Sequence, residues 1–120
     1  MADSFRTGRA DAFYPGDEIV QVVAADGYNW VGVRRGDRSR TFEAVFADFH
    51  AFGLQHHKQQ IIAEFGMASR QPGLASWIND ASATLRSWPA VIAELWFDQN
   101  NYVIRQDAVP ALRAMARGSS

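Results

Sequence analysis

Hydrophobic residues follow two different patterns along this chain. Near the start of the chain, short β-branched and apolar runs bounded by turn residues indicate β-structure. One β-branched stretch, Glu18–Ala25, and a second apolar stretch, Trp30–Arg34, lie on either side of Asp26-Gly27. An Asp-Gly pair between two such stretches is typical of a tight hairpin turn. We therefore predict an antiparallel hairpin over residues 18–34, which follows a turn at Pro15-Gly16-Asp17.

Apolar residues in the middle of the chain recur at spacings of three and four, which is the period of an amphipathic helix. Over residues 41–52 the recurring residues are phenylalanine and valine. Ser39 or Thr41 is the expected cap of this helix, and Gly53 is its expected stop. A strand through Thr41–Ala47 fits as well, so the sequence alone leaves the choice between helix and strand open for residues 41–52.

Three further segments have the helical period. Leucine, isoleucine and phenylalanine indicate a second helix between Leu54 and Gly66, and a longer apolar stripe indicates a third over residues 74–88. A final helix is expected after Asp107, which is its predicted cap, with Pro110 in the first turn, where proline is tolerated.

A second hairpin is predicted over residues 94–105. Its strands flank the turn cluster at residues 98–101, although residues 90–97 also fit a short helix. Together these elements predict an α+β fold, in which a small antiparallel sheet from two β-hairpins packs against three to four helices.

The length of 120 residues is that of one domain, and 48% apolar and 12% aromatic residues are enough to build its core. We therefore expect a single domain over residues 1–120, with flexible ends at residues 1–15 and 118–120. The chain has no cysteine, which excludes disulfides, thiol catalysis and thiolate zinc sites. It shows no signal-peptide pattern and no apolar run of membrane-spanning length, so we expect a cytoplasmic protein without a membrane partner.

A basic segment stands out against the net charge of −1. This segment, the arginine loop (residues 34–40), follows Tyr28 and Trp30 and carries four arginines. These are Arg34, Arg35, Arg38 and Arg40. Tryptophan, tyrosine and arginine are the usual anchors of protein interfaces. Arginine-rich composition is also typical of GC-rich genomes, so the sequence leaves open whether the arginine loop is functional or reflects codon usage.

Histidine and carboxylate residues suggest one candidate metal site. His50, His56 and His57 lie close together in sequence, and Asp48 could complete a shell of imidazole and carboxylate ligands. Their spacing matches no known metal-binding pattern, and adjacent histidines on a helix point in different directions. We therefore predict no metal and no other cofactor.

No catalytic motif is present: neither a G-x-S-x-G elbow nor a phosphate-binding glycine loop occurs. We expect a non-catalytic protein-binding module, such as an inhibitor, an immunity or antitoxin-like protein, an adaptor, or a small subunit of an assembly. Tyr28, Trp30 and the arginine loop form its predicted contact surface, and the partner is another protein or a second copy. The alternatives are a nucleic-acid or phosphate binder that uses the arginine loop, and a small metal-dependent enzyme around the histidines.

Overall fold

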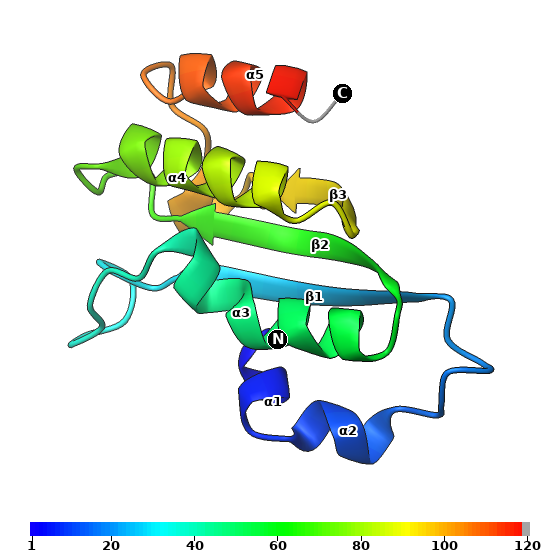
Figure 1. Cartoon of the computed structure of the whole chain (residues 1–120). Coiled ribbons are helices and arrows are strands. Elements are labelled where there is room, and N and C mark those ends of the chain that lie inside the picture. Colours follow the sequence, from blue (N-terminus) through cyan, green and yellow to red (C-terminus); the bar gives the residue numbers. More distant parts are fainter. Residues whose placement is uncertain (119–120) are drawn as a thin grey trace.

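A three-stranded, all-parallel sheet lies at the centre of the structure, a computed structural model that describes residues 1–118. The strands are β1 (Val22–Asn29), β2 (Gln59–Met67) and β3 (Val91–Trp96), and they lie side by side in the order β1-β2-β3. Neighbouring parallel strands need a crossover connection, and helices provide both crossovers here. Figure 1 shows the alternation of strands and helices along the chain.

The two crossover helices, α3 (Phe42–Gln55) and α4 (Leu74–Ser87), pack on the same face of the sheet (Figure 1). Helix α3 begins after Thr41, whose Oγ1 accepts a hydrogen bond from the backbone N–H of Ala44 at 3.1 Å. That bond satisfies one of the N–H groups that the first turn of a helix leaves without a partner. The expected cap at Thr41 is therefore confirmed.

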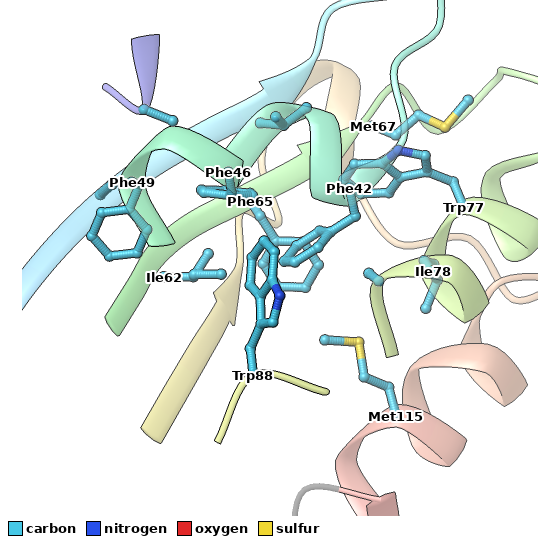
Figure 2. Close-up of a cluster of buried hydrophobic side chains, with 14 of the residues drawn as sticks. Phe42, Phe46, Phe49, Ile62, Phe65, Met67, Trp77, Ile78, Trp88 and Met115 are labelled. Atoms are coloured by element: carbon cyan, nitrogen blue, oxygen red, sulfur yellow. The ribbon is translucent and has the colours of Figure 1, made fainter. Parts of the chain in front are cut away.

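The core lies between these helices and the sheet. Aromatic rings fill most of it, and they contact one another edge to face, as in the pair Phe42–Phe65 with centroids 5.7 Å apart (Figure 2). Five of its largest side chains are almost completely buried: Phe42, Phe46, Phe49, Phe65 and Ile62. A chain without cysteine is thus held together by packed aromatic and aliphatic side chains.

Shorter helices surround this core. Helix α5 (Val109–Gly118) packs against α4 through the buried side chains of Ala111 and Met115. The helices α1 (Asp3–Arg6) and α2 (Arg9–Phe13) lie beside α3, and a single 3-10 turn, η1 (Asn100–Tyr102), follows β3. None of the helices in residues 1–118 is both long enough and apolar enough to cross a membrane.

The prediction of an antiparallel sheet from two hairpins is wrong, because the three strands pair in parallel. Asp26-Gly27 lies inside β1 and is not a turn. The reason is the close approach of α3: a Cβ atom on Gly27 would lie 2.6 Å from the ring of Phe46. Glycine in this strand therefore marks contact with a helix. After β1, residues 30–33 form a turn and not a returning strand.

The second predicted hairpin, over residues 94–105, is absent as well. Strand β3 confirms the strand interpretation of residues 90–97, but it pairs in parallel with β2. Asp98 Oδ1 accepts a hydrogen bond from the backbone N–H of Ile104 at 2.7 Å. This bond closes a loop and uses an N–H group that a returning strand would present to its neighbour.

The helix expected between Leu54 and Gly66 is also wrong, because most of this segment is strand β2. Gly53 does not stop α3 but lies buried inside it, and the helix ends at Gln55. The helical interpretation of residues 41–52 is confirmed, and so are the helices expected over residues 74–88 and after Asp107. Of the expected flexible ends, residues 119–120 lie outside the described residues, whereas the first fifteen residues contain α1 and α2.

The other face of the sheet carries few covering elements. Helix-facing residues such as Val23, Ala25 and Ile62 are buried, whereas their neighbours along the strands point to the opposite side. These neighbours form what we call the open face, which consists of Val22, Ala24, Ile61, Ala63, Ala93 and Leu95. At the carboxyl end of the sheet, residues 97–105 cross this side, where Tyr102 packs over Gly66.

Candidate functional site

A tyrosine and a glutamate from neighbouring strands meet at the carboxyl end of the sheet. The hydroxyl of Tyr28, in β1, donates a hydrogen bond to Oε2 of Glu64, in β2. Tyr28 is 8% exposed and Glu64 is half-buried. In open α/β sheets, ligands bind outside the carboxyl ends of the strands. This pair therefore occupies the position in the fold where function is expected.

An irregularity in β2 directs Glu64 to this side of the sheet. Ile62 and Phe65 both face the helices, and the register between β1 and β2 shifts so that Ile62 pairs with Ala25 while Glu64 pairs with Asp26. Ala63 is the additional residue of this bulge. Bulges are common next to active sites because they redirect a side chain.

Aromatic rings enclose Tyr28. Its ring centroid lies 4.9 Å from that of Trp30, 5.1 Å from that of Tyr102 and 5.8 Å from that of Phe97. The indole N–H of Trp96 donates to the carbonyl of Tyr102 at 2.8 Å and holds the loop after β3 in place. We refer to Tyr28, Trp30, Glu64 and Tyr102 as the carboxyl-end cluster.

Gly66 makes this cluster possible. A Cβ atom at this position would lie 2.9 Å from Cδ1 of Tyr102. Because glycine lacks that atom, the ring of Tyr102 can lie directly on the strand next to Tyr28. A small residue in β2 thus brings a loop after β3 to the glutamate site.

The environment keeps the Tyr28 phenol protonated. Burial raises the pKa of Tyr28, and its hydrogen bond to Glu64 raises that pKa further, with smaller contributions from the charges of Glu64 and Asp26. The raised pKa keeps Tyr28 a hydrogen-bond donor even above pH 10, where an ordinary phenol ionises. This bond fixes the position of the Glu64 carboxyl group.

Tyr102 has a different environment. Burial raises the pKa of its phenol, and the charge of Arg34 partly opposes this effect. Its hydroxyl is buried and makes no hydrogen bond to another of the described residues. Buried polar groups are satisfied in nearly all proteins, by protein atoms or by water. A hydroxyl-bearing ligand or a buried water molecule would meet this requirement.

The predicted contact surface is only partly assembled. Tyr28 and Trp30 adjoin each other, and the guanidinium of Arg34 lies 3.5 Å from the ring centroid of Trp30 in a cation–π contact. Arg35 and Arg38 are exposed on the arginine loop.

Arg40 serves a structural purpose at the other end of the loop. Its guanidinium lies 3.6 Å from Asp3 and donates to the carbonyl of Ala44, which ties the loop to α1 and α3. The structure thus places Tyr28, Trp30 and Arg34 together, and Arg40 lines one small pocket with Tyr28 and Trp30. Arg35 and Arg38 lie exposed on the loop, away from these residues. The role of this surface in binding stays a prediction.

The three histidines and Asp48 do not converge. His50 Nδ1 lies 2.8 Å from Oε1 of Gln60, whereas His56 Nδ1 lies 2.8 Å from Oδ1 of Asp17. His57 is exposed. Across residues 1–118, no group of three or more histidine, aspartate or glutamate side chains is arranged to hold a metal ion.

Two residues of the carboxyl-end cluster, Glu64 and Tyr102, are missing from the predicted contact surface. Glu64 was missed because its segment has the spacing of a helix, and Tyr102 because it was assigned to the second hairpin. A signal for Glu64 was nevertheless present: the short β-branched run Ile61-Ile62 is followed by a carboxylate and then by Phe65-Gly66. A buried strand that ends in a carboxylate is typical of the sites at the carboxyl ends of parallel strands.

Comparison with known proteins adds one relative. No protein-family model matches the chain. The chain is 37% identical over 89 residues to Endoglucanase H from the bacterium Acetivibrio thermocellus. The match covers 72% of this chain but 10% of the relative, so the chain spans about a tenth of the length of the relative that it matches. Any continuous segment that covers 72% of 120 residues includes β2, and therefore Glu64.

Proposed function

We propose that this chain supplies part of a saccharide-binding and glycoside-hydrolysing site, with Glu64 as the reacting carboxylate. The observation that carries this proposal is the hydrogen bond between Tyr28 and Glu64 at the carboxyl ends of neighbouring parallel strands. The relative is named as an endoglucanase, which is a glycan-cleaving enzyme, and the matched segment contains Glu64.

The chemistry of the pair suits this reaction. Glycoside hydrolases use a pair of carboxyl groups at the scissile bond, one of which acts on the sugar carbon directly or through a water molecule. Glu64 would act in this way. Tyr28 would be a positioning residue, because its neutral phenol holds one oxygen of the carboxyl group and leaves the other free for the substrate.

The neighbouring rings suit a sugar ligand. Aromatic side chains offer flat apolar surfaces, and Trp30 is half-exposed and packs against Tyr28 of the Tyr28–Glu64 pair. The apolar face of a pyranose could pack on this indole, while the sugar hydroxyls meet the polar atoms of the carboxyl-end cluster. Binding sites of this kind combine apolar walls with a few fixed polar groups.

Affinity electrophoresis through gels that contain soluble β-glucan tests this function. The wild-type chain should migrate more slowly in the glycan gel. Glu64→Gln should weaken the retardation, because the carboxylate that meets the sugar hydroxyls is lost. Tyr28→Phe should weaken it less, because it only releases the Glu64 carboxyl group from its fixed position. Glu18→Gln, at an exposed glutamate distant from the sheet end, is the matched control for Glu64→Gln. A folded wild-type chain that is not retarded by soluble β-glucan, xylan or mannan would contradict the proposal.

A second candidate function is protein binding through the arginine loop. Arg35 and Arg38 are exposed at its tip, and the contact of Arg34 with Trp30 anchors its beginning. Replacement of Arg35 and Arg38 by serine should abolish partner binding if this surface is used. If nucleic acid is the partner, affinity should fall steeply with salt, because phosphate contacts release counterions.

A further inference from the structure

A polar cavity of about 510 Å³ lies at the carboxyl end of the sheet. Its lining comes from the segments after all three strands: Gly32 follows β1, residues 68–71 follow β2, and four residues between Asn100 and Arg105 follow β3. Figure 1 shows these segments together at the end to which the strand arrows point. Ligands bind at this end of open α/β sheets, and the volume is that of a small-molecule site. The fold therefore places this cavity where a ligand is expected.

The cavity adjoins the carboxyl-end cluster through Tyr102. The ring of Tyr102 packs over Gly66, two residues after Glu64, and the preceding residue Asn101 lines the cavity. Ala68, which lines the cavity as well, follows Glu64 by four residues, or roughly 13 Å of extended chain. A glycan chain of a few sugar units bound at Glu64 would therefore reach into the cavity.

The lining carries positive charge without a carboxylate. Its charged side chains are those of Arg70 and Arg105. Within residues 1–118, the guanidinium of Arg70 makes no hydrogen bond or ion pair. Arg105 lies 3.8 Å from the exposed carboxylate of Asp107, and an exposed pair of this kind contributes little free energy. Both arginines are therefore available to an anionic ligand.

Neutral hydrogen-bonding groups complete the lining, and they tie the three segments together. The hydroxyl and the backbone N–H of Ser69 both donate to the carbonyl of Asn101, at 2.9 and 2.7 Å, which joins the segment after β2 to the segment after β3. A Cβ atom on Gly32 would lie 1.9 Å from Nε2 of Gln71, so glycine lets this amide lie against the segment after β1. The cavity is thus formed before a ligand arrives, which lowers the entropy cost of binding.

We propose that this cavity binds the carboxylate of an acidic sugar, as a subsite for a uronic acid unit of a glycan. A guanidinium matches a planar carboxylate with two parallel N–H···O bonds, and bonds between opposite charges are stronger than those between neutral groups. Arg70 and Arg105 bind the carboxylate, while the amides of Gln71 and Asn101 bind hydroxyls of the same ring. Affinity for the acidic sugar rests on the cavity alone, whereas its place as a subsite near the cleaved bond rests on the proposed function.

NMR titration of the chain with methyl β-D-glucuronide tests the cavity, because this method detects weak binding of a single sugar unit. The backbone N–H signals of Ser69, Gln71 and Asn101 should shift on binding. Methyl β-D-glucoside is the matched ligand, since a hydroxymethyl group replaces the carboxylate, and it should bind at least about tenfold more weakly. Acetate, which has the carboxylate without the ring, should also bind at least about tenfold more weakly than the glucuronide.

Substitutions test the two arginines. Arg70→Gln and Arg105→Gln each remove the charge and the paired donors of a guanidinium, so each should weaken glucuronide binding at least about tenfold. Arg113→Gln, at an exposed arginine of helix α5 that does not line the cavity, is the matched control and should leave the affinity unchanged. Arg70 is exposed, so its variant should keep the circular dichroism spectrum of the wild type.

Three results of these titrations would overturn the proposal. The first is equal binding of the glucuronide and the glucoside, because the carboxylate would then play no part. The second is a glucuronide affinity that survives both substitutions of the cavity arginines. The third is acetate binding as tight as that of the glucuronide, because the cavity would then be a general anion site.

Affinity gels separate this inference from the proposed function. Glucuronoxylan should retard the chain more strongly than unsubstituted xylan, and Arg70→Gln should remove this difference. Arg113→Gln, which removes the same charge elsewhere, should keep it. Equal retardation of the wild type by both xylans would overturn the subsite and leave the proposed function standing. Glucuronide binding in solution without retardation by any neutral glycan would overturn the proposed function and leave the acidic-sugar site standing.

Discussion

The imidazole of His50 lies flat against the indole of Trp88, with ring centroids 4.0 Å apart and planes inclined by 11°. Helix α3 carries the histidine, and the tryptophan ends α4, so this contact joins the two crossover helices. The same imidazole binds Gln60, which is completely buried at the start of β2. One ring thus links both helices to the central strand.

Removal of this ring should destabilise the fold. Gln60 Nε2 donates to the carbonyl of His50, so Oε1 of Gln60 is an acceptor and His50 Nδ1 donates to it. His50→Ala would leave Oε1 buried without a donor and should lower the free energy of unfolding by about 1–3 kcal/mol. Urea titration measures this loss. Gln55→Ala, at an exposed position of the same helix, should change stability little.

Gly53→Ala should destabilise the protein, although alanine is normally the better helix former by about 1 kcal/mol. The added Cβ atom would lie 2.4 Å from Nε2 of Gln60, whose side chain is packed on all sides. We expect a net loss of about 1–3 kcal/mol. In a double-mutant cycle, Gln60→Ala should remove most of this penalty. A Gly53→Ala protein that is more stable than the wild type would refute the close contact.

The carboxyl group of Asp17 should titrate below its ordinary pKa of 3.8. The hydrogen bond from the Tyr14 hydroxyl, at 2.8 Å, lowers this pKa most, and the bond from His56 lowers it further. The stabilising contribution of Asp17 is therefore fully present above pH 3.8 and is lost as the pH falls through the folded-state pKa. Carbon NMR of the carboxyl group measures the shift, and Tyr14→Phe should move the pKa back upward.

The three tyrosines should all resist ionisation in alkali. Burial and the bond to Asp17 raise the pKa of Tyr14 to about 12, and the pKa values of Tyr28 and Tyr102 are raised as well. At pH 10, half of the phenols of the unfolded chain are ionised, but few of those in the folded chain. Phenolate absorbance should therefore appear on addition of denaturant at this pH. The contribution of these phenols to stability is present below pH 10 and is lost as the pH rises through the folded values.

Helices α3, α4 and α5 could be predicted from the sequence because their apolar stripes are long, although Gly53 does not end α3 and Asp107 is two residues before the start of α5. The short helices α1 and α2 lie where flexible residues were expected. Thr41 and Pro110 stand where helix starts need them. The sheet could not be predicted, for two physical reasons. Gly27 has the appearance of a turn residue but is required by the contact with Phe46, and the apolar spacing of β2 fits a helix as well as a strand.

The interpretation of β2 as a helix explains why the parallel topology and Glu64 were both missed. With residues 59–67 as a strand, strands and helices alternate along the chain, and that alternation predicts a parallel sheet. Glu64 then falls at the carboxyl end of the central strand. Tyr28, Trp30 and Arg34 are predicted as site residues because aromatic residues precede the arginine loop. The contact of Tyr28 with Glu64 depends on a register that the sequence pattern does not reveal.

The bulge at Ala63 has a consequence for how this site is inherited. Strict alternation from Ile62 would turn Glu64 into the aromatic core and Phe65 onto the open face. The extra residue shifts the phase of the strand, so that both side chains reach the environment that suits them. The identity of Glu64 is therefore meaningful only together with the local chain length, and a homologue that keeps this glutamate but lacks the phase shift would have lost the site.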